Sequence, residues 1–218
     1  MLKRTLAFAG ILSATSFALG QTPPPYHANN TLWPTTLSRT MDYYVGIGVG
    51  RDSNTLEDKL NGYVVNHGVG GFTGELLHGV QIPLPANFGV AIENNWAIST
   101  AEEKIKAPGS TQKLSKPYTI GLSVLPNYQT YSLGSVFLRL GAVYSEYKAT
   151  GTEIELYNFK KWVLGGQIGV GYTFDLSYHT SLRGEYDYSL YKSFTTTTGG
   201  ETLTPRSNQF MLSFLVRF

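Results

Sequence analysis

Apolar and polar residues alternate along the last ten residues of the chain. The apolar positions are Phe210, Leu212, Phe214, Val216 and Phe218, and the residues between them are mostly smaller or polar. Alternation with a period of two predicts a β-strand with one apolar face. A long apolar edge strand would aggregate in water. We therefore expect this strand to close a barrel, with its apolar face against lipid.

The same alternation recurs in seven segments upstream, each near the roughly ten residues that a tilted strand needs to cross a membrane. These segments are residues 43–51, 70–82, 88–99, 116–125, 134–147, 162–174 and 181–191. The final strand should pair in antiparallel fashion with residues 43–51. The pattern predicts an all-β protein, an eight-stranded antiparallel up-and-down transmembrane β-barrel.

The connections between these segments alternate in length. Three short ones carry turn residues and cover residues 83–87, 126–133 and 175–180. Four longer ones are rich in Lys, Glu, Thr and Gly and cover residues 52–69, 100–115, 148–161 and 192–206. Short periplasmic turns and long extracellular loops are typical of outer-membrane barrels.

The N-terminal segment has the features of an export signal. Lys3 and Arg4 precede an apolar run over residues 5–12, and Ala18 and Gly20 fit a small-residue cleavage site. We expect residues 1–20 to be a cleaved signal peptide, residues 21–40 a flexible, Pro-rich periplasmic leader, and residues 41–218 the barrel. The chain has no Cys, which excludes a lipoprotein anchor and disulfides. Its net charge of +2 gives no reason to expect a nucleic-acid partner.

A secreted soluble barrel, such as a lipocalin-type calyx, is the alternative to a membrane barrel. Its outer face would carry Lys and Glu along the strands. Here every Lys after the signal lies in a connection or at a segment end, and the second phase is mostly Gly, Ser, Thr, Ala and Gln. Small residues suit the narrow lumen of eight strands, so the apolar phase should face lipid. The aromatic girdle would consist of Tyr43, Trp96, Tyr118, Tyr144, Trp162, Tyr172 and Tyr188, with Phe218.

Charged residues in the second phase form the candidate site. They are Glu75, Glu93, Arg139, Arg183, Glu185, Asp187 and Arg217. Charges inside a barrel must be paired or hydrated, so we expect a salt-bridge network that plugs the lumen. The alternative is a narrow ion path lined by the same charges. The four His residues are scattered without metal-ligand spacing, and we expect no metal or cofactor.

Three stretches resemble the OmpA-like/OmpX-like (opacity-type) family of eight-stranded outer-membrane β-barrels. They are the Gly-rich residues 43–50, the hairpin formed by residues 169–174 and 182–188, and the terminal Phe218. The resemblance implies a place in the bacterial outer membrane, in contact with its lipid and lipopolysaccharide. It also implies that the apolar residues of the final strand, from Phe210 to Phe218, are the signal read by periplasmic chaperones and the barrel-assembly machinery.

The functional prediction is a non-catalytic surface barrel that supports the envelope and presents four loops for adhesion or a host ligand. A small pore is the main alternative. A lipid A-modifying enzyme is a remote alternative. It is considered because His179, Thr180 and Ser181 match a His-x-Ser pair and Glu185 lies nearby in the sequence. His179 falls in a predicted periplasmic turn, away from outer-leaflet lipid A, so we expect no enzyme.

Overall fold

The computed structural model describes residues 41–60, 63–107, 110–130, 134–151, 159–195 and 202–218. The predicted signal peptide and leader lie outside these residues. Among the described residues, no helix has the length and apolar character needed to cross a membrane.

Every regular element in the described chain is a β-strand. The strands are β1 (Asp42–Leu60), β2 (Tyr63–Pro83), β3 (Phe88–Ser99), β4 (Glu102–Ala107), β5 (Ser110–Ser115), β6 (Tyr118–Thr130), β7 (Gly134–Gly151), β8 (Phe159–Asp175), β9 (Thr180–Tyr191), β10 (Phe194–Thr195) and β11 (Thr202–Arg217).

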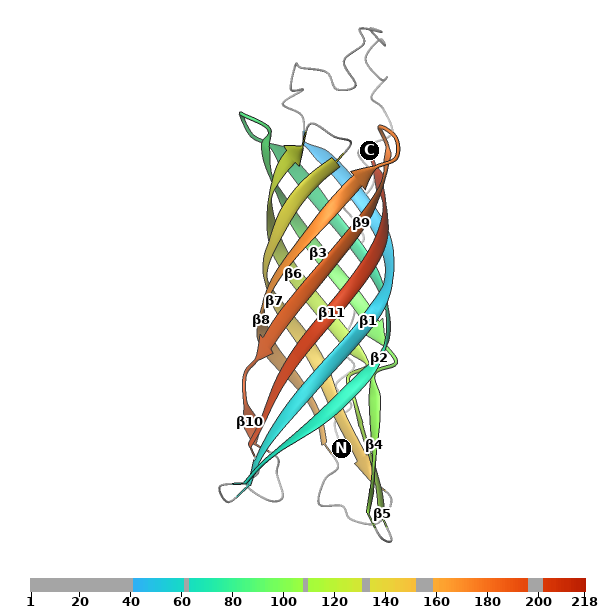
Figure 1. Cartoon of the computed structure of the whole chain (residues 1–218), viewed down its shortest axis with the longest axis vertical. Coiled ribbons are helices and arrows are strands. Elements are labelled where there is room, and N and C mark those ends of the chain that lie inside the picture. The colour runs from blue at the N-terminus through green and yellow to red at the C-terminus, as the bar shows by residue number, and fades with distance from the viewer. Residues whose placement is uncertain (1–40, 61–62, 108–109, 131–133, 152–158, 196–201) are drawn as a thin grey trace, which may run out of the picture. The chain divides into compact units, whose positions relative to one another are not determined.

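Eight of these strands form a closed antiparallel barrel, which confirms the predicted fold class. Their order around the wall is β1, β2, β3, β6, β7, β8, β9 and β11, and Figure 1 shows the strands tilted around the barrel. The last strand closes the ring against the first, with Val216 opposite Val45 and Phe210 opposite Arg51. Closure pairs the backbone groups of both terminal strands and leaves no free edge there.

The side chains of each spanning strand alternate between the lumen and the outside. On β9, Leu182, Tyr186 and Leu190 are exposed, while Arg183 and Glu185 are buried. The same alternation puts large apolar side chains on the outside of all eight spanning strands. An exposed apolar surface that surrounds a closed barrel fits hydrocarbon and not water.

The two ends of the barrel differ. At one end, here called the turn end, residues 84–87 and 176–179 form short turns beside the start of β1 and the end of β11. At the other, here called the extension end, strands continue past the apolar belt. There β1 and β2 pair up to Leu60 and Tyr63.

The prediction of long loops is therefore wrong for much of the extension end. Residues 52–60 and 63–69 are strand, β4 and β5 occupy the connection at 100–115, β7 runs on to Gly151, and β11 begins at Thr202. The predicted turn at 126–133 is also shortened, because β6 continues to Thr130. An antiparallel ladder is made by backbone groups, so polar side chains do not end it once the strands leave the membrane.

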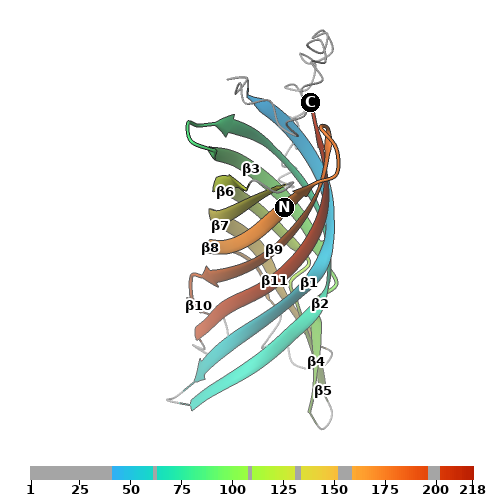
Figure 2. The same cartoon turned by 45° about the horizontal axis from the view of Figure 1, so that its top comes forward.

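The β4–β5 hairpin completes the wall where β3 and β6 end. Gly70 of β2 pairs with Glu102 of β4, and β5 pairs with β7 from Gln112 to Ser115. Figure 2 shows the hairpin projecting beyond β2 at the extension end. The hairpin therefore continues the barrel wall and at the same time presents charged residues beyond it.

Candidate functional site in the barrel lumen

Arg139 of β7 is the centre of a buried ion-pair network. One guanidinium nitrogen, Nη2, donates to Glu93 Oε1 at 2.7 Å and to Glu185 Oε2 at 2.8 Å. Its Nε lies 3.4 Å from Asp187 Oδ1. The Arg139 side chain is 1% exposed, so these carboxylates replace water almost completely as its partners. One cation thus ties β3, β7 and β9 together across the lumen.

Glu93 of β3 joins Arg139 to a second cation. Its Oε2 accepts from Arg183 Nη1 at 2.5 Å and from the Tyr44 hydroxyl at 2.8 Å. The Arg183 guanidinium also lies over the rings of Tyr44 and Phe137, at 5.4 and 5.0 Å from their centroids. Both oxygens of the fully buried Glu93 are therefore charge-compensated, as burial of a carboxylate requires.

Glu75 of β2 has a different environment from Glu93. It accepts a hydrogen bond from Ser213 at 2.9 Å, and no cation of the described chain forms an ion pair with it. The central cluster therefore holds four buried acids, Glu75, Glu93, Glu185 and Asp187, against two buried arginines. Glu75 therefore differs from the other three acids, because its described contact is a hydrogen bond and not an ion pair.

The structure brings six of the seven predicted lumen charges together and places Arg217 elsewhere. Arg217 Nη2 pairs with Asp175 Oδ1 at 2.8 Å, and Ser181 donates to the same oxygen at 2.9 Å. Both partners lie at the turn end. The phase of a strand predicts on which side of the wall Arg217 lies, but it does not predict the height of this residue along the barrel.

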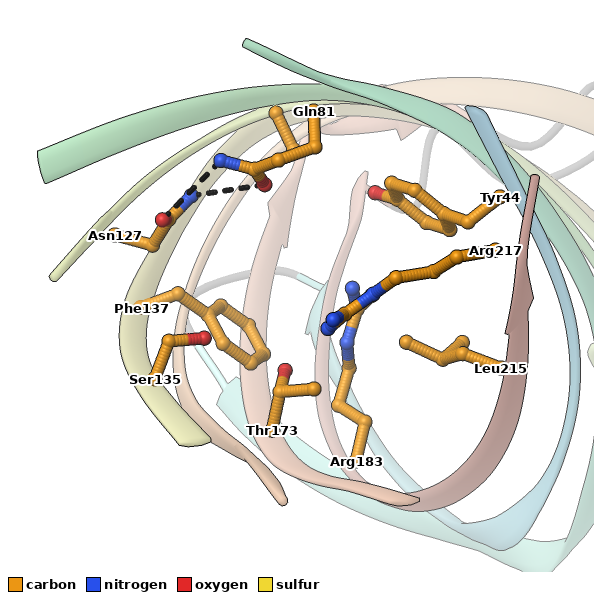
Figure 3. A pocket seen from close by; sticks show the side chains of 10 residues that line it. Tyr44, Gln81, Asn127, Ser135, Phe137, Thr173, Arg183, Leu215 and Arg217 are labelled. Carbon is orange, nitrogen blue, oxygen red and sulfur yellow. Dashed lines mark hydrogen bonds between the residues drawn. The ribbon is translucent and has the colours of Figure 1, made fainter. Parts of the chain in front are cut away.

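An apolar cluster lies between the central network and the turn end. It consists of Tyr44, Leu77, Ala91, Leu125, Phe137 and Leu215. Beyond it, the amides of Gln81 and Asn127 donate to each other at 3.3 and 3.2 Å. A cavity of about 30 Å³ opens here beside Arg183 and Arg217 (Figure 3). This volume suits water-sized occupants.

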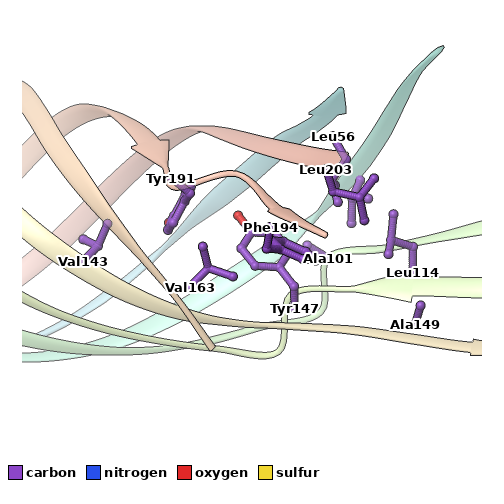
Figure 4. Packing of buried hydrophobic residues seen from close by; sticks show 11 residues of the cluster. Leu56, Ala101, Leu114, Val143, Tyr147, Ala149, Val163, Tyr191, Phe194 and Leu203 are labelled. Atoms are coloured by element: carbon purple, nitrogen blue, oxygen red, sulfur yellow. The ribbon is translucent and has the colours of Figure 1, made fainter. Parts of the chain in front are cut away.

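A second apolar cluster fills the extension end (Figure 4). It is made of Leu56, Val69, Ala101, Leu114, Val143, Tyr147, Ala149, Val163, Tyr191, Phe194 and Leu203, with Phe159 packed against them. Its rings meet edge to face, with centroids 5.4 Å apart for Tyr147 and Tyr191 and 5.5 Å apart for Phe159 and Phe194. The lumen therefore has apolar clusters at both ends of its charged layer.

A buried lysine, Lys116, lies next to this cluster, and its burial was not predicted from the sequence. Lys116 Nζ pairs with Asp52 Oδ2 at 3.0 Å, and Ser207 bridges the two by accepting from Lys116 and donating to Asp52. The ammonium also lies 5.5 Å from the centroid of the Tyr191 ring. Burial alone would lower the pKa of Lys116, but Tyr191 and Asp52 outweigh it and raise the pKa above its ordinary value.

The signal for this second charged site was present in the strand phase. The inward positions of β1 are even-numbered from Tyr44 onward, and Asp52, Asn54 and Leu56 continue that phase. Because residues 52–69 were assigned to a loop, the continued alternation of inward side chains along β1 was not recognised. Lys116 lay at the start of a predicted segment, where a lysine normally reaches water.

The residues of the alternative catalytic pair do not meet. Ser181 donates to Asp175, and Glu185 is bound by Arg139. His179 is exposed in the turn, with Nδ1 3.4 Å from the Arg217 carbonyl oxygen. Across the ranges that the structure describes, no group of three or more His, Cys, Asp or Glu side chains could hold a metal ion.

The predicted lipid-facing residues all lie in the outward phase. Tyr43, Trp96, Tyr118 and Tyr144 are exposed, and Trp162, Tyr172 and Tyr188 are half-buried. The rings of Tyr144 and Trp162 stack with centroids 5.0 Å apart. On β11, Phe210, Leu212 and Phe214 are exposed and Val216 is half-buried, and the exposed Phe218 follows the strand. Their role as an assembly signal stays a prediction.

Comparisons with known proteins agree with this geometry at the level of the fold. No protein-family profile matches the sequence, and no curated protein matches it. A major outer membrane protein from Thermus thermophilus aligns with a TM-score of 0.50 and 16% identity, over 82% of this chain and 100% of that one. The chain has the outer-membrane β-barrel fold.

Two further structures align with this barrel. Ail, the attachment invasion locus protein of Yersinia pestis, was solved in complex with the heparin analogue sucrose octasulfate. It aligns with a TM-score of 0.46 and 15% identity, over 81% of this chain and 99% of that one. Neisserial surface protein A aligns with a TM-score of 0.45 and 19% identity, over 79% and 97% of the two chains.

The contrast between Glu93 and Glu75 gives a matched pair of substitutions. Glu93→Gln removes a charge that two arginines require, and we expect it to lower the free energy of unfolding by about 3–5 kcal/mol. Glu75→Gln keeps an acceptor for Ser213 and removes an acid that has no ion-pair partner among the described residues. It should change stability by less than about 1 kcal/mol.

Urea unfolding in one lipid composition, followed by tryptophan fluorescence, measures both variants. Equal losses for the two variants would mean that the arginines do not distinguish the two acids, which would contradict the assignment of charges in the network.

Proposed function

We propose that this chain is a non-catalytic surface protein of the bacterial outer membrane. Its lumen is closed, and its extension end points out of the cell to contact lipopolysaccharide and other envelope or host partners. The observation that carries the proposal is the filled lumen, in which a charged layer lies between two apolar clusters. A barrel of this kind acts through its outer surfaces.

The order of layers in the lumen disfavours the pore alternative. A hydrated ion entering from either end would have to pass an apolar cluster before it reached Arg139. It would then meet carboxylates and guanidiniums that already neutralise one another, as Arg139 does with Glu93 and Glu185. The cavity at the turn end is too small for a solute larger than a few waters.

The absence of catalysis is proposed from the same contacts. A serine nucleophile needs a base within hydrogen-bond reach. Ser181 instead donates to Asp175, whose other partner is Arg217. His179, the candidate base, is exposed in the turn.

The extension end offers charged groups on rigid strands. Lys148 of β7 lies directly opposite Lys160 of β8, and Tyr147 lies opposite Lys161. The three lysines are exposed, and the stacked pair of Tyr144 and Trp162 marks the edge of the apolar belt just below them. Lys160 Nζ pairs with Glu146 Oε2 at 3.3 Å, and Lys161 Nζ lies 5.2 Å from the centroid of the Phe194 ring. Lys148 has no ion pair among the described residues, so an anionic partner would bind this patch through Lys148. Lipopolysaccharide phosphates lie at this depth in the outer leaflet.

A conductance measurement tests the closed lumen. We expect the protein, reconstituted in planar bilayers, to give no sustained current steps, while a known porin inserted in the same way gives them. A reproducible open state, altered by substitution of Arg139, would establish the pore alternative in place of the proposed function.

Binding of lipopolysaccharide tests the lysine patch. The substitution Lys148→Glu should reduce retention of lipopolysaccharide by the folded barrel by roughly tenfold, since a lysine near an anionic surface contributes on the order of 1 kcal/mol and a glutamate in its place adds repulsion. Lys104→Glu on the β4–β5 hairpin is the matched control and should leave retention unchanged. Equal retention by all three proteins would remove lipopolysaccharide as the partner of this patch.

A further inference from the structure

Two polar side chains interrupt the lipid-facing surface at one place. The belt comprises the outward positions of residues 43–49, 72–82, 88–98, 118–128, 136–144, 162–174, 182–190 and 210–216. Within these described segments, the outward positions carry hydrocarbon, aromatic or glycine residues, and the exceptions are His78 on β2 and Asn94 on β3.

These two exceptions are direct neighbours. His78 and Asn94 lie opposite each other in the β2–β3 ladder, where outward side chains start about 5 Å apart. Their next neighbours in the same row are Val45 of β1 and Leu122 of β6, which are both apolar. The belt therefore contains one polar spot, made by two strands, in otherwise hydrocarbon surroundings.

The polar groups of this spot are only partly satisfied. Asn94 Nδ2 donates to the Gly121 carbonyl oxygen at 2.9 Å, which holds the amide in place and leaves its side-chain oxygen as a free acceptor in the described chain. The exposed imidazole of His78 has no hydrogen bond to any described residue. An exposed polar group in hydrocarbon is costly unless a partner binds it.

The depth of the spot limits what that partner can be. On β2, Phe72, Gly74 and Leu76 separate His78 from the extension end of the belt, and Val80 and Ile82 separate it from the turn end. Asn94 lies equally deep on β3, between Ile92 and Trp96. Lipid headgroups and water do not reach this depth, so the partner must be a protein that carries polar groups in the membrane interior.

We propose that the β2–β3 face is a self-association surface, and that His78 and Asn94 bind the same pair on a second copy of this chain. A second copy in the same membrane brings a histidine and an asparagine to the same depth. A twofold axis parallel to the barrel axis sets each His78 N–H against the Asn94 oxygen of the other copy. This satisfies the donor and the acceptor in one isologous contact.

The cysteine-free sequence makes the contact straightforward to test. Ile92→Cys places a single thiol on the outward face of β3, and Val170→Cys places the matched control thiol on β8, on another part of the ring. The purified chain is reconstituted in phospholipid vesicles and oxidised with copper phenanthroline, which partitions into lipid. We expect Ile92→Cys to form covalent dimers well above the level of Val170→Cys.

Leucine at the two polar positions then tests the hydrogen bonds. Adding His78→Leu and Asn94→Leu to Ile92→Cys should lower dimer formation roughly tenfold, the effect of losing two modest hydrogen bonds in lipid. Leucine is suited to a lipid-facing position, so the variant should fold, and a shift in gel mobility on heating checks this. Equal cross-linking by Ile92→Cys and Val170→Cys would overturn the proposal. A leucine variant that dimerises undiminished would overturn it as well.

Discussion

A charge inside an eight-stranded barrel has almost no room for water, so it must find an opposite charge in the protein. This constraint explains the arrangement around Arg139. Its guanidinium binds Glu93 and Glu185, and Glu93 in turn binds Arg183. These residues belong to β3, β7 and β9, so the register of three strands is tied to one set of contacts. Gly48 and Gly169 at inward positions leave room for the side chains of Glu75 and Asp187, two further acids of this cluster.

The lumen uses the same combination of groups twice along its length. Near the turn end, Arg183 pairs with Glu93 and lies over the rings of Tyr44 and Phe137. Near the extension end, Lys116 pairs with Asp52 and lies by the Tyr191 ring. In both places a cation joins a charged site to an aromatic member of an apolar cluster. The side chains of both ion pairs are almost completely buried, and low exposure to water strengthens such pairs.

The architecture could be predicted from the sequence because a membrane barrel imposes a strict period of two. The apolar phase of the eight segments, with Phe210, Leu212 and Phe214 on the last, was enough for strand number, closure and the lipid face. The height of each side chain along the barrel could not be predicted, since alternation determines only whether a side chain faces the lumen or the lipid. Arg217 therefore fell into the wrong charge cluster. Lys116 and Asp52 were expected to be exposed to solvent, because polar residues at the ends of strands usually are. The strands extend further than predicted, and both side chains are buried.

The central claim is that Arg139 and Glu93 stabilise the barrel as a pair. A double-mutant cycle tests it most directly, with unfolding free energies in one lipid for Arg139→Met, Glu93→Met and the double variant. Each single substitution takes one of the opposite charges away from a buried charge and should cost about 3–5 kcal/mol, while the double variant should cost clearly less than the sum of the two. A double variant whose loss equals the sum of the single losses would contradict the account.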